Sequence, residues 1–141
     1  MTPQKRLNRR QCRELVVSML YEHQLSENNP DDIFDYRVTQ KSYSDSSHEF
    51  IEELFRGIIR DKEKIDDIIT RHLIDWDFER VAPIEKNILR LATFEYLTAS
   101  HTPPEVIINE AVEISKTLGS THSSQFINAV LDKIASTLDL L

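Results

Sequence analysis

The residues with the most evident chemical use are basic side chains near the amino terminus. The first thirteen positions hold five of them and no acidic residue: Lys5, Arg6, Arg9, Arg10 and Arg13. On a helix, the last three arginines share one face about 100° wide beside the apolar stripe. Guanidinium groups bind phosphates and base edges. We therefore predict a solvated arginine face for a nucleic acid. The alternative is a basic face that pairs with the chain's own acidic residues.

Tyr21 lies on the same side of this predicted helix as Arg10, away from the apolar stripe. A ring near clustered arginines suits RNA with unstacked bases, because the ring stacks on a base while the arginines hold phosphates. Tyr21 would serve equally well to cover another helix. Arginines in a first helical turn oppose the helix dipole, which favours a functional reason for their presence.

Residue patterns typical of enzymes are missing from the sequence. The five histidines, at positions 23, 48, 72, 101 and 122, show no ligand spacing, and two glycines cannot build a phosphate loop. His23 and the single cysteine, Cys12, lie on an apolar stripe, so we interpret them as core or boundary residues. We expect no catalysis, no metal and no cofactor.

The charge is unevenly distributed along the 141 residues. The chain carries 17 Lys and Arg against 24 Asp and Glu, a net charge of -7, which taken alone argues against a nucleic-acid ligand. The first thirteen residues are nevertheless strongly positive, so the acidic excess lies in the remainder. That acidic body would attract a basic protein. The single cysteine, the polar amino terminus and the lack of a long apolar run predict a cytoplasmic protein without a membrane span.

Apolar residues recur at spacings of three and four nearly throughout, which predicts an all-α bundle of six or seven helices. We expect one domain over 1–141, with a basic segment at 1–13 and an irregular connection at 26–47. Within that connection, a short helix is possible from four apolar residues: Ile33, Phe34, Tyr36 and Val38. After a break around Asp61, the apolar pattern continues to Trp76.

Several helix boundaries are predicted from capping residues. Expected starts are Asn8 with Gln11, Ser46 with Glu49, Pro83 as a first helical residue, and Thr102 with Pro103 and Glu105. Gly119 is expected to end a helix in the left-handed conformation. Ser120 or Thr121 is then expected to cap the last helix.

Four ordered segments resemble the NusB family of bacterial transcription antitermination factors: RRQCRELVVSMLYEHQLS, EKNILRLATFEY, VIINEAVEISKTLG and FINAVLDKI. The resemblance implies an all-α fold of two small helical subdomains. It implies binding of single-stranded boxA RNA together with a small-subunit ribosomal protein, NusE. It also implies assembly with other Nus factors on RNA polymerase, which suppresses termination in ribosomal RNA operons without catalysis or a cofactor.

The same resemblance assigns site residues. The arginine motif falls on Arg9, Arg10 and Arg13, and its tyrosine on Tyr21. Glu85 and Arg90 fall near the RNA and ribosomal-protein surfaces, and a carboxylate at Glu85 can accept base amino protons. The implied RNA-facing edge is completed by Gly119, Ser120, Thr121, His122 and Phe126. The alternative function is a helical protein-interaction module without RNA specificity of its own. Some relatives dimerise, so a homodimer that buries the arginine face is also considered.

Overall fold

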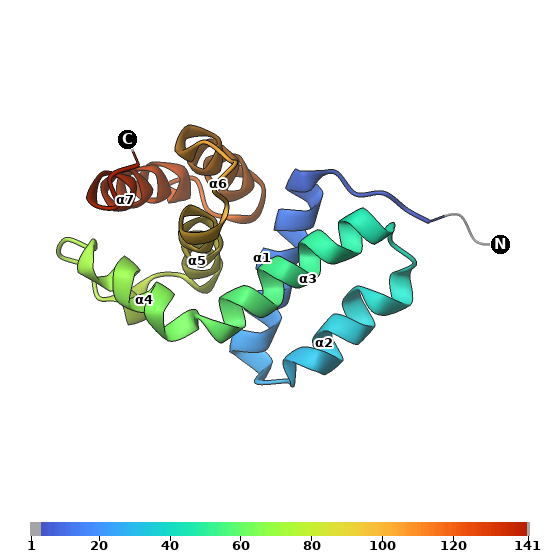
Figure 1. Ribbon diagram of the computed structural model, residues 1–141. Helices are drawn as coiled ribbons and strands as arrows, with labels where there is room; N and C mark the ends of the chain where they lie inside the picture. The colour runs from blue at the N-terminus through green and yellow to red at the C-terminus, as the bar shows by residue number, and fades with distance from the viewer. Residues whose placement is uncertain (1–3, 141) are drawn as a thin grey trace. The chain divides into compact units, whose positions relative to one another are not determined.

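The computed structural model describes residues 4–140. The described residues form seven α-helices and two short 3-10 helices (Figure 1), with no named strand among them: α1 (Arg9–Ser26), α2 (Pro30–Arg37), η1 (Thr39–Lys41), α3 (Asp45–Arg60), α4 (Lys62–Arg71), η2 (Phe78–Arg80), α5 (Pro83–Thr98), α6 (Pro104–Leu118) and α7 (Ser123–Thr137). The all-α prediction is confirmed. The chain divides into two compact units, Met1–Arg60 and Asp61–Leu141. Residues 1–3 of the predicted basic segment, and Leu141, lie outside the described residues.

The first unit is built on α1, which begins where the sequence predicts. The Gln11 backbone N–H donates to Asn8 Oδ1 at 2.8 Å, and the Asn8 N–H donates to Gln11 Oε1 at 2.9 Å. This reciprocal capping box satisfies two donors that the helix end leaves open. The helix then packs on α2 and α3. Its buried apolar residues are Cys12, Val16, Val17, Met19 and Leu20.

The predicted irregular connection at 26–47 is largely helical, which corrects that part of the sequence analysis. Asn29 caps α2 by accepting a hydrogen bond from the Asp31 N–H at 2.8 Å, and Pro30 is the first helical residue. The short helix considered for this stretch is therefore present. Its apolar residues are buried, except that Tyr36 is 63% exposed.

The start of α3 is also two residues earlier than predicted. Ser44, not Ser46, caps this helix, because Ser44 Oγ accepts from the Ser47 N–H at 3.3 Å. The helix ends at Arg60 and α4 begins at Lys62, as the break expected around Asp61 requires.

The second unit is organised around α5, which packs against α4, α6 and α7 (Figure 1). Pro83 is the first residue of α5, as predicted. Ten consecutive residues of this helix, from Asn87 to Tyr96, are buried, so it forms the centre of the unit. The helices α6 and α7, which pack against it, contribute buried apolar residues that include Ile107, Ile114, Ile127, Leu131 and Ile134.

Two predicted helix starts in the second unit are wrong. Pro104 is the first residue of α6, after Pro103, and no side chain caps it, so Thr102 does not form the expected capping box. The last helix begins at Ser123 without a side-chain cap from Ser120 or Thr121. Local capping patterns predict these starts less well because two consecutive prolines and a buried serine decide them.

Gly119 and Trp76 also differ from expectation. Gly119 has φ -97° and ψ -169°, so it is extended and not left-handed. Trp76 lies beyond the end of α4 and is 58% exposed, so it does not continue the apolar stripe of a helix. Trp76 instead lines a pocket of the second unit that is described below.

Candidate nucleic-acid interface

The arginine surface, defined by Lys5, Arg6, Arg9 and Arg10, lies at the start of α1 in the first unit. All four residues are exposed. They combine two residues of an extended segment with the first turn of a helix, so their basic groups lie on one short stretch of chain. Such a surface suits phosphates, which accept hydrogen bonds from guanidinium and ammonium groups.

The extended segment before α1 is held in place by hydrogen bonds within the first unit. The Lys5 N–H donates to Ser42 O at 3.0 Å, and the Ser44 N–H donates to Lys5 O at 2.8 Å. The Leu7 N–H donates to Ser47 Oγ, which is itself buried, at 3.0 Å. The basic side chains of this segment therefore project from a fixed backbone.

Arg13 does not belong to the solvated face, which corrects the helix-wheel prediction. It is only 7% exposed, and its guanidinium carbon lies 5.4 Å from the centroid of the Phe50 ring. The Arg9 guanidinium lies 4.0 Å from the same ring but remains exposed. The face of an aromatic ring attracts cations, so both arginines lie against Phe50. Arg13, next to the buried Cys12 in the sequence, is buried with it, whereas Arg9 stays at the surface.

The remaining predicted residues of α1 divide between surface and core. Tyr21 is half-buried, so part of its ring reaches solvent. His23 Nδ1 lies 2.8 Å from Asn28 O, which satisfies a boundary histidine. Cys12 is fully buried, and burial raises the pKa of its thiol.

Among the described residues, no three His, Cys, Asp or Glu side chains are placed to hold a metal ion.

The second unit contains a pocket of about 290 Å³ that we call the Trp76 pocket. It brings together three residues predicted from the sequence, Glu85, His122 and Phe126. Its other lining residues are Trp76, Arg80, Val81 and Ala82. The rings of Trp76 and Phe126 lie 6.0 Å apart between centroids, tilted by 59°. An aromatic pocket with an arginine in its wall can hold an unstacked base.

Sequence reasoning missed Trp76 and Arg80. Trp76 stands between Asp75 and Asp77, and two flanking acids fit a loop better than the buried stripe of a helix. Asp75 has φ 60°, and Asp77 Oδ1 accepts a hydrogen bond from the Glu79 N–H at 3.3 Å. The alternation of acids with an aromatic residue was the available signal.

The Glu85 carboxylate is held by a serine at the start of the last helix. Ser123 Oγ donates to Glu85 Oε1 at 2.6 Å, and the Ser120 N–H donates to Ser123 Oγ at 2.8 Å. Ser120, which belongs to the predicted RNA-facing edge, is thereby linked to the Glu85 carboxylate through the buried Ser123 hydroxyl. Ser120, Thr121 and His122 are exposed.

Arg90 is part of the interior of the second unit, although the family resemblance implies a position near the RNA and ribosomal-protein surfaces. It is 6% exposed. Its Nε and Nη2 donate to the two carboxylate oxygens of Asp66 at 2.7 and 2.9 Å, and its Nη1 donates to Asn87 Oδ1 at 3.0 Å. The prediction of a direct partner contact by Arg90 is therefore corrected.

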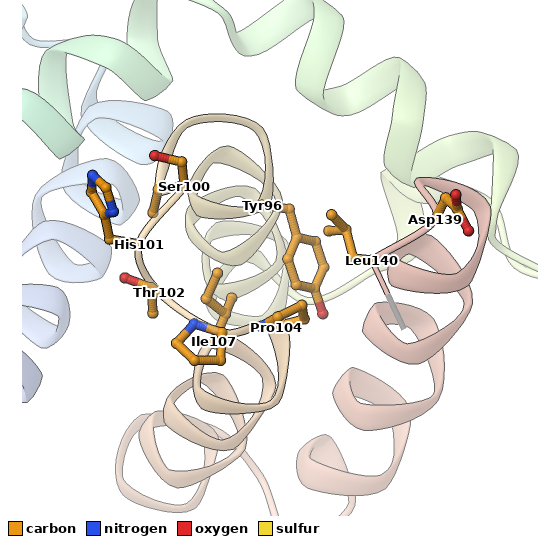
Figure 2. A pocket seen from close by; sticks show the side chains of 10 residues that line it. Tyr96, Ser100, His101, Thr102, Pro104, Ile107, Asp139 and Leu140 are labelled. Atoms are coloured by element: carbon orange, nitrogen blue, oxygen red, sulfur yellow. The ribbon is translucent and has the colours of Figure 1, made fainter.

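A further pocket of about 340 Å³ lies where α5 and α7 end (Figure 2). Its walls come from those two ends and from the turn between α5 and α6, and they include Tyr96 and Leu140. The Tyr96 hydroxyl donates to Leu131 O at 3.1 Å. Burial, followed by the charge of Asp132, raises the pKa of Tyr96 well above its ordinary value of 10.0. This pocket contains none of the residues predicted to contact RNA.

Among residues 4–140, no helix combines the length and the apolarity that crossing a membrane requires.

Comparison with known proteins places the chain in a family. A model described as the NusB family matches residues 10–136. The transcription antitermination protein NusB of Wolinella succinogenes is 42% identical over 130 residues, which cover 92% of this chain and 96% of the relative. Its counterpart from Nitratiruptor sp. is 40% identical over 127 residues, covering 90% and 91%.

Solved structures agree with this assignment. T. maritima NusB matches with a TM-score of 0.86 and 34% identity, covering 93% of this chain and 92% of that chain. A chain in the crystal structure of antitermination factors NusB and NusE in complex with dsRNA matches with a TM-score of 0.82 and 27% identity, covering 92% and 96%. The protein therefore belongs to the NusB family of transcription antitermination proteins.

Proposed function

We propose that this protein binds the boxA element of nascent RNA together with ribosomal protein NusE and thereby suppresses termination in ribosomal RNA operons. The observation that carries the proposal is the arginine surface, four exposed basic residues on a backbone held by hydrogen bonds. The matching solved structure that contains NusB, NusE and RNA supports it. Such a factor acts in the cytoplasm, where transcription occurs in bacteria.

The two units have different tasks in this proposal. Lys5, Arg6, Arg9 and Arg10 bind phosphates, and Tyr21 offers a ring for stacking. In the second unit, the Trp76 pocket receives an unstacked base, with Glu85 accepting hydrogen bonds from its amino group. Gly119, Ser120, Thr121, His122 and Phe126 form the remainder of this edge.

The partner surface is assigned to the second unit. This unit carries fourteen acidic and eight basic residues, and an acidic surface favours association with a basic ribosomal protein. Glu85 remains the predicted contact residue. Other Nus factors and RNA polymerase complete the assembly, and a homodimer that covers the arginine surface would compete with RNA.

The test is RNA binding over a range of salt concentrations, with and without NusE. Three to four phosphate contacts predict a slope of log affinity against log salt of about -2 to -3 for a single strand. NusE should tighten the binding. A duplex of the same sequence serves as the comparison, because the relative was crystallised with dsRNA. Binding of NusE without any RNA binding would favour the alternative, a protein-interaction module.

A further inference from the structure

Ser123 is a buried hydroxyl whose hydrogen bonds all serve the candidate interface. It is 0% exposed at the first position of α7. Its Oγ donates to Glu85 Oε1 at 2.6 Å, accepts from the Ser120 N–H at 2.8 Å and lies 3.0 Å from Ser120 Oγ. A serine hydroxyl has one proton and two lone pairs. With its proton on Glu85, both lone pairs are filled by Ser120, so the bonding capacity of Ser123 is complete.

The turn before α7 is shaped to admit this hydroxyl. A Cβ atom at Gly119 would lie 2.7 Å from Ser123 Oγ and 2.8 Å from Ser115 O. Because Gly119 has an ordinary extended backbone, its lack of a side chain is required by the close approach of Ser123 and not by its φ angle. The turn, the buried hydroxyl and the carboxylate therefore form one rigid connection.

We propose that Ser123 is a positioning residue that aims the Glu85 carboxylate at the exocyclic amine of a base in the Trp76 pocket. The inference rests on the proposed function. An ionised carboxylate only accepts hydrogen bonds, and the exocyclic amines of adenine, cytosine and guanine are donors that uracil lacks. Fixing Oε1 restricts the rotation of a flexible side chain, so the carboxylate meets one base orientation. Ser123 thus sets base preference without touching RNA.

The experiment measures base discrimination with boxA RNAs in which one base at a time loses its exocyclic amine, as purine riboside for adenosine or inosine for guanosine. Wild-type protein should bind at least one analogue about tenfold more weakly, as expected for one hydrogen bond. Ser123→Ala should reduce that ratio to below about threefold. In the Glu85→Ala background, which lacks the acceptor oxygen, Ser123→Ala should change the ratio no further, because Ser123 acts through Glu85.

Ser124→Ala is the matched control. The neighbouring Ser124 hydroxyl lies 2.8 Å from Ser115 Oγ, another hydroxyl of the same unit, so its removal should leave the tenfold ratio intact. Ser123→Cys replaces the hydroxyl by a slightly larger and weaker donor and should give an intermediate ratio. It provides the measurement if Ser123→Ala fails to fold.

The outcomes separate this inference from the proposed function. The salt slope, which depends on the arginine surface, should be the same in all these variants. An unchanged ratio in Ser123→Ala, an equal loss in Ser124→Ala, additive effects with Glu85→Ala, or a wild-type protein indifferent to the amine would each overturn the role of Ser123. A wild-type protein without salt-dependent RNA binding would overturn the proposed function itself.

Discussion

A cluster of exposed basic residues in the first unit contrasts with a buried, paired arginine in the second unit. The first unit carries nine basic and ten acidic residues, and four of its basic side chains lie exposed at the start of α1. The second unit carries eight basic and fourteen acidic residues, and one of its cations, Arg90, is buried and paired with the Asp66 carboxylate. Net charge therefore does not locate a binding surface. Exposure and the hydrogen-bonding partners of each cation do.

The largest effect is expected from removing the buried cation. Arg90→Ala leaves Asp66 without its bidentate partner in a partly buried place, which should lower the free energy of unfolding by about 3 kcal/mol. Arg71→Ala is the control, because its pair with Asp67 is exposed and contributes at most about 1 kcal/mol. Chemical denaturation measures both. If both variants lost the same free energy of unfolding, Arg90 would contribute no more to stability than an exposed arginine does.

Neutralising the arginine surface should have the opposite profile, with RNA affinity lost and stability kept. We expect Arg6, Arg9 and Arg10, changed together to alanine, to weaken RNA binding on the order of 100-fold at low salt and to reduce the salt slope by about 2. Arg13→Ala is the matched variant, because Arg13 is buried and should affect stability more than the slope. Filter binding or anisotropy across salt decides this. An unchanged slope in the triple variant would remove the basis of the proposed function.

The aromatic rings test whether the second unit contacts bases. Trp76→Ala should weaken RNA binding by about 1–3 kcal/mol if a base stacks on the ring, with no change in the salt slope. Trp76→Phe should recover part of the loss. Tyr36→Ala, which removes an exposed ring from the first unit, serves as the control. A loss that appears equally in the control would mean that the effect is not local to the Trp76 pocket.

The smallest effect concerns alkaline pH. The pKa of Tyr96 is raised in the folded protein, so the unfolded chain releases this proton at a lower pH than the folded chain does. The contribution of this proton to the free energy of unfolding is complete below pH 10.0. It falls as pH rises further, by at most about 1.4 kcal/mol per pH unit. Urea denaturation at increasing pH should show this decline in the wild type and a shallower one in Tyr96→Phe. If the free energy of unfolding fell equally with pH in both proteins, the raised pKa of Tyr96 would be contradicted.

Local signals predicted the helices of both units well. Asn8 with Gln11 and the position of Pro83 each depend on residues within one turn, and the structure confirms both starts. Arg13 shows the limit of this reasoning. A helix wheel places it beside the arginines, but its burial depends on Phe50, which comes from another helix far along the chain.

The pocket in the second unit was predicted only in part. Glu85, His122 and Phe126 followed from the family resemblance, whereas Trp76 was assigned to a helix that ends before it. Gly119 was correctly placed at a helix end for the wrong reason, because the steric demand of Ser123 is not visible in a one-dimensional pattern. Contacts between distant residues account for each of these differences.

The hydrogen bonds that hold the segment before α1 also determine the thermodynamics of association. Because Lys5 and Leu7 are already fixed to the first unit, the backbone that presents the basic groups loses little conformational entropy when a ligand arrives. The segment is preorganised, unlike a disordered basic tail that folds on binding. Its amides should accordingly be protected from hydrogen exchange before any RNA is added, and Ser47→Ala should remove that protection at Leu7.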